Sequence, residues 1–195
     1  MGKLVAIGGG IGSGKSIVSG ILRTMGFRVY DCDSNAKDIM TSDEVVKREI
    51  IAEFGNEVYR NNELNRAGLA RIVFNDEAAR ERLNAIVHPR VISHVLQWWK
   101  NGTANGEVVA FVETALLKES GFDAIVDDVW WVEAPEKIKI ERVRMRDGMN
   151  EEDIKARIKA QDNAPDEHWT LIDNSENVAL LPQVMRLLSL YENQK

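Results

Sequence analysis

The sequence predicts an α/β fold built on a mostly parallel, five-stranded sheet. Short apolar runs, typical of buried strands, alternate along the chain with longer stretches of helical spacing. Five runs are strand candidates, at residues 4–7, 27–30, 108–112, 129–132 and, more weakly, 169–172. This alternation is the pattern of a doubly wound core, in which ligands bind at the carboxyl ends of the strands.

Two helical stretches are too long to be simple crossovers between neighbouring strands. They span residues 34–100 and 135–161, and we expect a substrate-binding cap from the first and a lid from the second. The prediction is therefore a single domain over residues 1–195. Its core comprises residues 1–33, 101–134 and 162–195.

The chain ends in a predicted helix at about residues 175–191, which Ser175 is placed to cap. Residues 101–106 are expected to form a loop, because they combine glycine, asparagine and threonine. Pro89 lacks a backbone donor, so it should kink the helical stretch around it or start a second helix.

A phosphate-binding loop follows the first strand, because residues 9–16 fit the pattern G-x-x-x-x-G-K-S. Glycines let successive N–H groups turn inward around phosphate oxygens. Lys15 can reach the β- and γ-phosphates, and the Ser16 hydroxyl can bind Mg²⁺. The predicted ATP-binding residues of this segment are Gly10, Ile11, Gly12, Ser13, Gly14, Lys15, Ser16 and Ile17.

Bulk composition limits the kinds of partner. The chain has 195 residues, 44% of them hydrophobic, and no apolar run near 18 residues, so we expect a globule without a membrane span. One cysteine excludes an internal disulfide and fits a reducing cytoplasm. A net charge of −6 argues against broad binding of nucleic acid or anionic membranes. No signal peptide is visible, and we expect a cytoplasmic monomer or weak homo-oligomer.

Two carboxylates end the second strand, at Asp31 and Asp33. Phosphoryl transfer needs an oriented acceptor, and a carboxylate that takes the proton of the acceptor hydroxyl supplies this. We favour Asp33, at the junction of strand and helix, as a catalytic residue. The alternative is that Asp33 only caps the next helix.

Three further charged residues are candidates for the site. Glu113 ends the third strand and could hold Mg²⁺ through water, although a cap or core-edge role fits it equally well. Arg142 and Arg146 are four residues apart, so they share one helix face. As a mobile pair they could close on the phosphates and neutralise charge, with a solvated helix face as the alternative.

Taken together, these segments resemble the dephospho-coenzyme A kinases along nearly the whole chain. The phosphate loop is followed by Asp31-Cys32-Asp33, where that family has Asp-Ala-Asp. Residues 64–74, 83–89 and 113–119 look like its Leu-Asp-Arg, Leu-x-x-Ile-x-His-Pro and Asp-x-Pro-Leu-Leu-Phe-Glu segments. The order continues with Arg142-x-x-x-Arg146-Asp147, Arg157-x-x-x-Gln161 and Asn174.

The resemblance implies a P-loop kinase-like fold and the last step of coenzyme A biosynthesis. In that reaction the γ-phosphoryl of ATP passes, with Mg²⁺, to the ribose 3′-hydroxyl of dephospho-coenzyme A. By resemblance, Arg142, Arg146 and Asn174 belong to the ATP side, with Arg142 and Lys15 also catalytic. Asp33, Arg66 and His88 belong to the substrate side. A surface ion pair for Arg66 and a structural role for His88 stay open.

The chain departs from the family pattern at four positions. Gly8 replaces the usual Thr, and Ile17 replaces a hydroxyl residue that follows Lys-Ser. Ala115 and Lys118 replace the Pro and Phe of Pro-Leu-Leu-Phe. None of these changes alters Lys15, Ser16 or Asp33, so we expect ordinary chemistry with altered ATP affinity.

Other functions of phosphate loops remain as alternatives. Shikimate kinases also carry Asp-x-Asp after the second strand, but they need a Gly-Gly-x-Gly substrate loop after the third strand, and none follows that strand here. Nucleoside monophosphate kinases stay possible on fold alone. A non-metabolic nucleotide switch of the GTPase kind needs Asp-x-x-Gly and Asn-Lys-x-Asp elements, and neither occurs.

Overall fold

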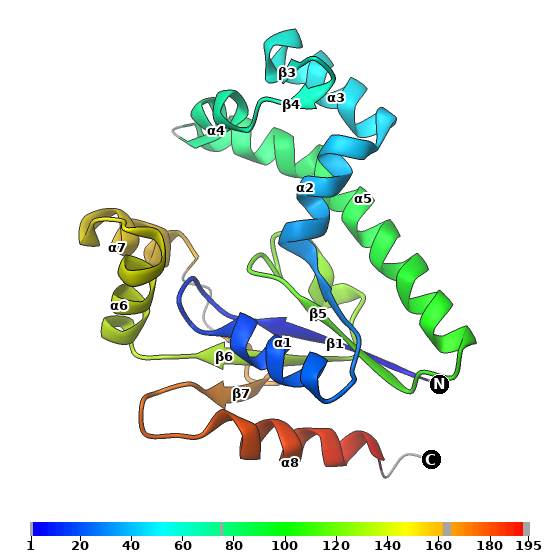
Figure 1. The fold of residues 1–195 in the computed structure, drawn as a ribbon, viewed down its shortest axis with the longest axis vertical. Helices are drawn as coiled ribbons and strands as arrows, with labels where there is room; N and C mark the ends of the chain where they lie inside the picture. Colours follow the sequence, from blue (N-terminus) through cyan, green and yellow to red (C-terminus); the bar gives the residue numbers. More distant parts are fainter. Residues whose placement is uncertain (1, 75, 162–164, 193–195) are drawn as a thin grey trace. The chain divides into compact units, whose positions relative to one another are not determined.

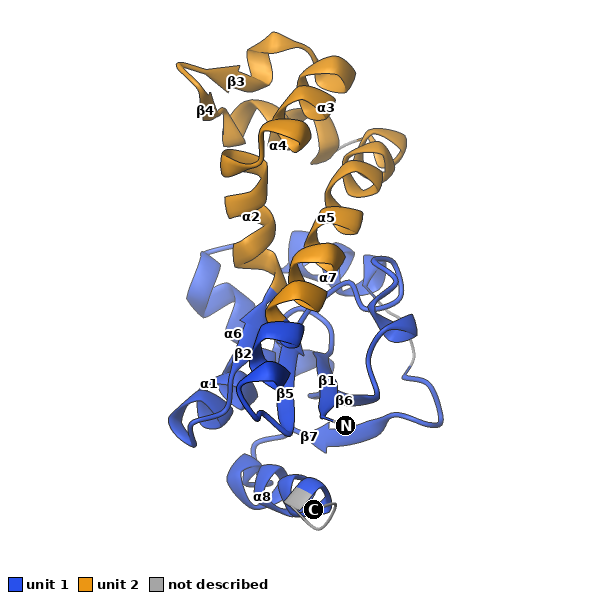
Figure 2. Ribbon diagram, turned by 90° about the vertical axis from the view of Figure 1, so that its right-hand side faces the viewer, with its two compact units in different colours: residues 1–31, 99–195 blue, residues 32–98 orange. Residues whose placement is uncertain are grey.

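A computed structural model describes residues 2–74, 76–161 and 165–192. The chain divides into two compact units, one formed by residues 1–31 and 99–195 and the other by residues 32–98 (Figure 2). Each unit has its own secondary structure and buried residues. No helix among the described residues is long and apolar enough to cross a membrane.

The first unit contains a five-stranded sheet in which every strand pair is parallel (Figure 1). The strand order is β2-β5-β1-β6-β7. The strands are β1 (Lys3–Gly8), β2 (Val29–Asp31), β5 (Val109–Glu113), β6 (Asp128–Glu133) and β7 (Thr170–Asp173). The prediction of a five-stranded parallel sheet is confirmed, with strand ends shifted by one or two residues. Parallel pairing places the carboxyl ends of all these strands at one edge of the sheet.

Two helices, α1 (Lys15–Thr24) and α8 (Leu180–Glu192), pack on one face of this sheet (Figure 1). The apolar side of α1 buries Val18 and Leu22 at the helical spacing of four residues. Under the helices lies an aromatic pair, with the rings of Phe111 and Trp130 5.0 Å apart. The buried members of this core are Val5, Ile7, Val18, Leu22, Val109, Phe111, Trp130, Val132, Ile172, Val184, Leu187 and Leu188.

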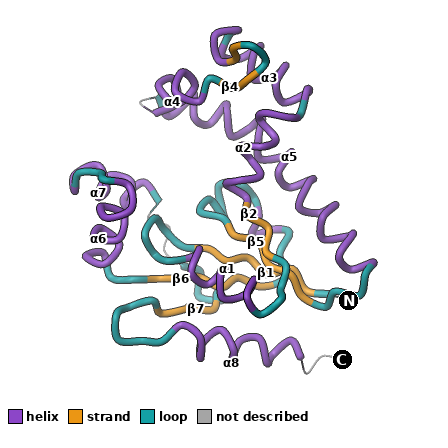
Figure 3. The backbone as a smooth tube through the Cα atoms, in the orientation of Figure 1, coloured by secondary structure: helices purple, strands orange, loops and turns teal. Residues whose placement is uncertain are grey.

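The predicted lid region forms two helices, α6 (Glu136–Asp147) and α7 (Glu151–Ala160) (Figure 3). Gly148 ends α6 with φ 66°, a left-handed conformation that favours glycine. Asn150 caps α7, because its side chain accepts a hydrogen bond from the N–H of Asp153 at 2.9 Å. The described part of the unit also has a short 3₁₀ turn, η2 (Phe122–Ala124).

The second unit is mainly helical, with α2 (Cys32–Ser42), α3 (Glu44–Phe54), α4 (Arg66–Phe74) and most of α5 (Glu77–Ala104). A 3₁₀ turn η1 (Asn56–Val58) leads into a small hairpin of β3 (Tyr59–Arg60) and β4 (Glu63–Leu64). The Tyr59 hydroxyl donates to the carbonyl of Met40 at 2.6 Å, which ties the hairpin to α2. Burial raises the pKa of this phenol to about 12, so it stays a donor at physiological pH.

Three local predictions need correction or completion. Residues 101–104 are the last turn of α5 and not a loop; Thr103 donates its hydroxyl to the carbonyls of Trp99 and Lys100 there. Ser175 does not cap the last helix, which begins at Leu180; the N–H of Ser175 instead bonds the Asp173 carboxylate at 2.8 Å. Pro89 lies inside α5 and does not begin a second helix.

The neighbouring strand explains why position 8 has a glycine, which has no side chain. It pairs in register with Trp131 of β6, and a Cβ on Gly8 would lie 2.8 Å from the indole ring. Trp131 is buried and stacks on Trp169, with ring centroids 5.2 Å apart, and Lys118 lies over the Trp169 ring. Gly8 and Lys118, two of the residues that differ from the family pattern, therefore both lie next to the indole rings of Trp131 and Trp169.

We predict that Gly8→Ala lowers the free energy of unfolding by about 1–3 kcal/mol, because the indole fills the space that a methyl group needs. Gly20→Ala is the matched control inside α1, where a Cβ meets no atom within 4 Å. That control should raise stability by about 0.5–1 kcal/mol. Urea unfolding measures both; a Gly8→Ala variant as stable as the parent would contradict the packing argument.

Candidate active site

The loop between β1 and α1 has a backbone that only glycine adopts readily. Gly9, Gly12 and Gly14 have φ of 141°, 75° and 101°. A Cβ at Gly12 would lie 2.6 Å from the carbonyl oxygen of Lys139 on α6, and one at Gly14 would collide with the Asn174 amide. The glycines of the motif thus allow the loop to turn, and they also leave room for α6 and Asn174 to pack against it.

Three side chains bind the carbonyl oxygens of this loop. The Lys15 ammonium donates to Gly9 at 2.7 Å and to Gly10 at 3.2 Å. Asn174 donates its Nδ2 to Ser13 at 2.7 Å. Arg142 adds longer bonds of 3.4 Å to Gly12 and Ser13. With these carbonyls held by donors, the loop can turn other peptide N–H groups toward an anion. The N–H groups of Ile11 and Ser13 already bond the Gln161 side chain and the Gly10 carbonyl.

Asn174 reaches the loop because of the sheet. It follows β7 directly, and its own N–H donates to the carbonyl of Glu133 at the end of β6, at 2.8 Å. Its side chain is buried, and its carbonyl accepts a bond from Arg142 at 3.1 Å. The loop, the end of β7 and α6 therefore meet at one buried amide.

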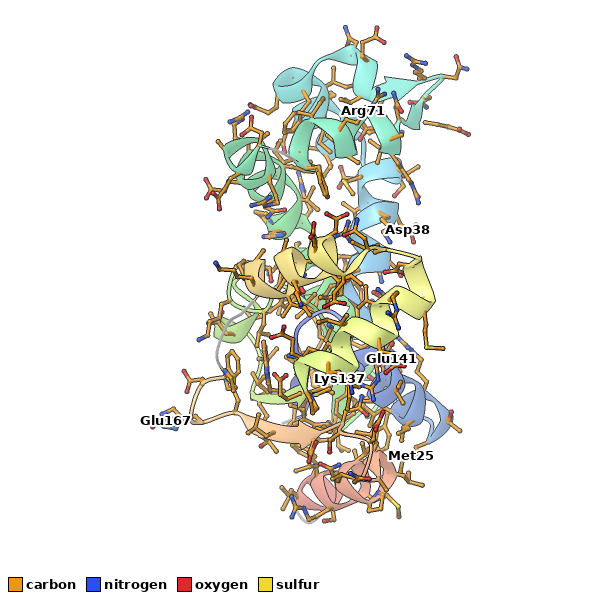
Figure 4. The ribbon with its side chains drawn as sticks, turned by 90° about the vertical axis from the view of Figure 1, so that its left-hand side faces the viewer. Met25, Asp38, Arg71, Lys137, Glu141 and Glu167 are labelled. Carbon is orange, nitrogen blue, oxygen red and sulfur yellow. The ribbon has the colours of Figure 1, made fainter. Side chains whose placement is uncertain are left out.

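The two candidate lid arginines have different partners. Arg142 turns toward the loop, whereas the exposed Arg146 forms two bonds of 2.8 Å with its neighbour Asp147. Lys137 and Glu141 of the same helix are exposed (Figure 4). With Arg144 they line a cavity that Glu151 and Lys155 of α7 also border. Of the predicted pair, the structure brings Arg142 alone to the phosphate loop, and an ATP contact of Arg146 stays a prediction.

Two carboxylates lie side by side at the sheet edge. Glu113 ends β5 and Asp31 ends β2, and the two residues pair in register. Burial raises the pKa of the Glu113 carboxyl, and the charge of Asp31 adds to this, while Ser19, Lys15 and Arg23 act in the opposite direction. This edge therefore combines a half-buried carboxyl with a lysine of the phosphate loop.

The remaining predicted residues lie in the first turns of helices or along α5. Ser16 and Ile17 are exposed in the first turn of α1. In the second unit, Asp33 is exposed in the first turn of α2 and Arg66 begins α4. His88 is half-buried in the middle of α5.

Comparison with known proteins agrees with this geometry. The sequence profile of the dephospho-CoA kinase family matches residues 3–179. A dephospho-CoA kinase of Moorella thermoacetica is 40% identical over 160 residues, covering 81% of this chain and 76% of its own. That of Porphyromonas gingivalis is 38% identical over 190 residues, covering 94% and 92%.

The chain belongs to the dephospho-CoA kinase family. A solved dephospho-CoA kinase from Campylobacter jejuni shares its fold, with a TM-score of 0.70 over 100% of both chains at 22% identity. The chain is thus an ATP-dependent phosphotransferase that acts on the ribose hydroxyl of dephospho-coenzyme A. The sequence-based identification of family, fold class and activity is confirmed, which leaves the individual roles of the site residues as predictions.

The oxygen donors at the sheet edge suit a magnesium ion. Mg²⁺ prefers oxygen ligands and keeps several waters, taking one or two protein oxygens beside the substrate phosphates. The Ser16 hydroxyl and the Glu113 carboxylate are oxygen donors of this kind. Over the described ranges, no three His, Cys, Asp or Glu side chains form a metal-binding group.

One contact of the phosphate loop was not predicted from the sequence. Gln161, at the end of α7, accepts a hydrogen bond from the N–H of Ile11 at 2.9 Å. The Arg157-x-x-x-Gln161 spacing marked the residue without giving it a role. A contact between residues 150 positions apart depends on how α6 and α7 fold back over the loop, which no local pattern encodes.

We predict that Glu113→Gln changes how stability depends on pH. Because the carboxyl has a raised pKa in the folded protein, its stabilising contribution is full below the unfolded value of 4.5 and is lost as pH rises through the folded pKa. Relative to Glu113→Gln, the parent's free energy of unfolding should therefore fall with rising pH. Urea titrations without Mg²⁺ from about pH 4 to about pH 7.5 measure this; parallel profiles for the two proteins would exclude a raised pKa.

Proposed function

We propose that Lys15, Arg142 and Asp33 carry the transfer of the γ-phosphoryl group of ATP to the ribose 3′-hydroxyl of dephospho-coenzyme A, giving coenzyme A and ADP. The observation that supports this most is the anchoring of the loop carbonyls by Lys15, Arg142 and Asn174. Anchored in this way, the loop offers peptide N–H groups and two cations to a triphosphate.

On the ATP side, the loop residues Gly10 to Ile17 bind the phosphates together with Asn174 and Arg142. The N-terminus of α1 adds its positive end to the same anion. As the β–γ phosphate bond breaks, Lys15 and Arg142 stabilise the charge that spreads over the transferred group. Arg146 joins them if its bond to Asp147 is exchanged for phosphate.

Mg²⁺ is the cofactor in this proposal, held by the Ser16 hydroxyl and, through water, by Glu113. When bound, the ion neutralises charge on the β- and γ-phosphates. Glu113 would ionise more readily beside a cation, which offsets the effect of its burial on the pKa. Its neighbour Asp31 adds negative charge to the same edge.

On the acceptor side, Asp33 receives the proton of the ribose hydroxyl as the new P–O bond forms. Its position supports this role, because Asp33 follows the end of β2 by two residues and is exposed in the first turn of α2. Arg66 and His88 complete the substrate side within residues 34–100, and residues 135–161 serve as the lid. We place this activity in the cytoplasm, in a monomer or weak homo-oligomer.

The test is the variant Asp33→Asn, which keeps the size of the side chain and removes the base. Turnover of dephospho-coenzyme A should fall by about 100- to 10,000-fold, while ATP affinity stays near that of the parent. Asp38→Asn is the matched control, an exposed carboxylate further along α2 that should leave turnover unchanged (Figure 4).

The readout is ADP release with dephospho-coenzyme A, shikimate or a nucleoside monophosphate as acceptor. Only dephospho-coenzyme A should stimulate release by the parent protein. Stimulation by one of the other acceptors instead would overturn the proposed substrate, and normal turnover of Asp33→Asn would remove Asp33 from the mechanism.

A further inference from the structure

The side chain of Gln161 touches the phosphate loop at its first residues. Its Oε1 accepts the hydrogen bond from the N–H of Ile11 at 2.9 Å, and its own backbone N–H donates to the carbonyls of Arg157 and Ile158 at the end of α7. Backbone and side chain are therefore both held. The amide group of Gln161 has a fixed place beside the loop.

This place is the γ-phosphate end of the loop. The Lys15 ammonium, which pairs with β- and γ-phosphates, lies against the carbonyls of Gly9 and Gly10. Ile11 is the next residue along the chain.

The bond to Ile11 also fixes which half of the amide is left for a ligand. A glutamine amide has one acceptor oxygen and one nitrogen with two N–H donors. Because Oε1 faces the N–H of Ile11, the Nε2 group is directed away from that peptide. The two N–H donors of Nε2 are then the part of this side chain that is left for a ligand.

We propose that Gln161 is a γ-phosphate-binding residue that distinguishes ATP from ADP. Its Oε1 stays on Ile11, and its Nε2 donates to an oxygen of the γ-phosphoryl group before and during transfer. The inference rests on the proposed function only in taking ATP as the phosphoryl donor. After transfer the group has left for the acceptor, so ADP lacks the oxygen that Gln161 binds.

The test compares ATP and ADP affinity in Gln161→Glu. A glutamate can still accept the bond from Ile11 but has no N–H donor and carries negative charge. Hydrogen bonds to charged groups are among the stronger ones, so ATP affinity should fall at least about tenfold, and ADP affinity should change less than about threefold. Titration calorimetry with Mg²⁺ and no acceptor measures both.

Two further variants control the comparison. Gln161→Met removes both the oxygen and the nitrogen of the side-chain amide without adding charge, and it should also weaken ATP binding more than ADP binding. Lys159→Ala removes a charge from the same last turn of α7, where Lys159 is exposed, and should leave both affinities unchanged. Thermal midpoints close to the parent's confirm that each variant is folded.

Equal losses for ATP and ADP in the Gln161 variants, or no loss in either, would overturn the inference. That result would leave only a structural contact with Ile11. The parent's turnover of dephospho-coenzyme A is measured separately, so a wrong acceptor assignment and a wrong role for Gln161 give different results.

Discussion

A backbone segment that offers its N–H groups to an anion must turn its carbonyl oxygens elsewhere and give them partners. In this protein the partners are side chains from the loop itself and from two distant segments. Lys15 binds the carbonyls of Gly9 and Gly10, and Asn174 and Arg142 share that of Ser13. Helix α6 and the residue that follows β7 both contact the loop through these side chains.

The parallel sheet supplies the rest of the geometry. Because β1, β5 and β6 run side by side in one direction, the loop, Glu113 and the start of α6 all follow strand ends at one edge. Packing at that edge is tight, since the indole of Trp131 leaves no room for a side chain at Gly8. The register of the strands therefore decides which residues lie next to one another at this edge.

Most of the fold and part of the candidate site could be predicted from the sequence. The phosphate loop and the positions of the five strands along the chain could be predicted, because each is a local sequence pattern with a known physical cause. Asn174 was placed by resemblance, and the structure adds the buried bond that explains it. Helix ends were less predictable. Residues 101–104 continue α5, where the Thr103 hydroxyl bonds the carbonyls of Trp99 and Lys100, and Ser175 bonds the Asp173 carboxylate instead of capping α8.

Contacts between residues far apart in the sequence could not be predicted. Helical spacing put Arg142 and Arg146 on one face, but only the packing of α6 on Gly12 decides that Arg142 meets the loop and Arg146 bonds Asp147.

The affinity of the Asn174→Ala variant for nucleotide tests the central claim most directly. If the anchored carbonyls hold the loop in its binding conformation, ATP and ADP affinity should both fall about tenfold in a folded variant. Unchanged affinity for both nucleotides would contradict this account.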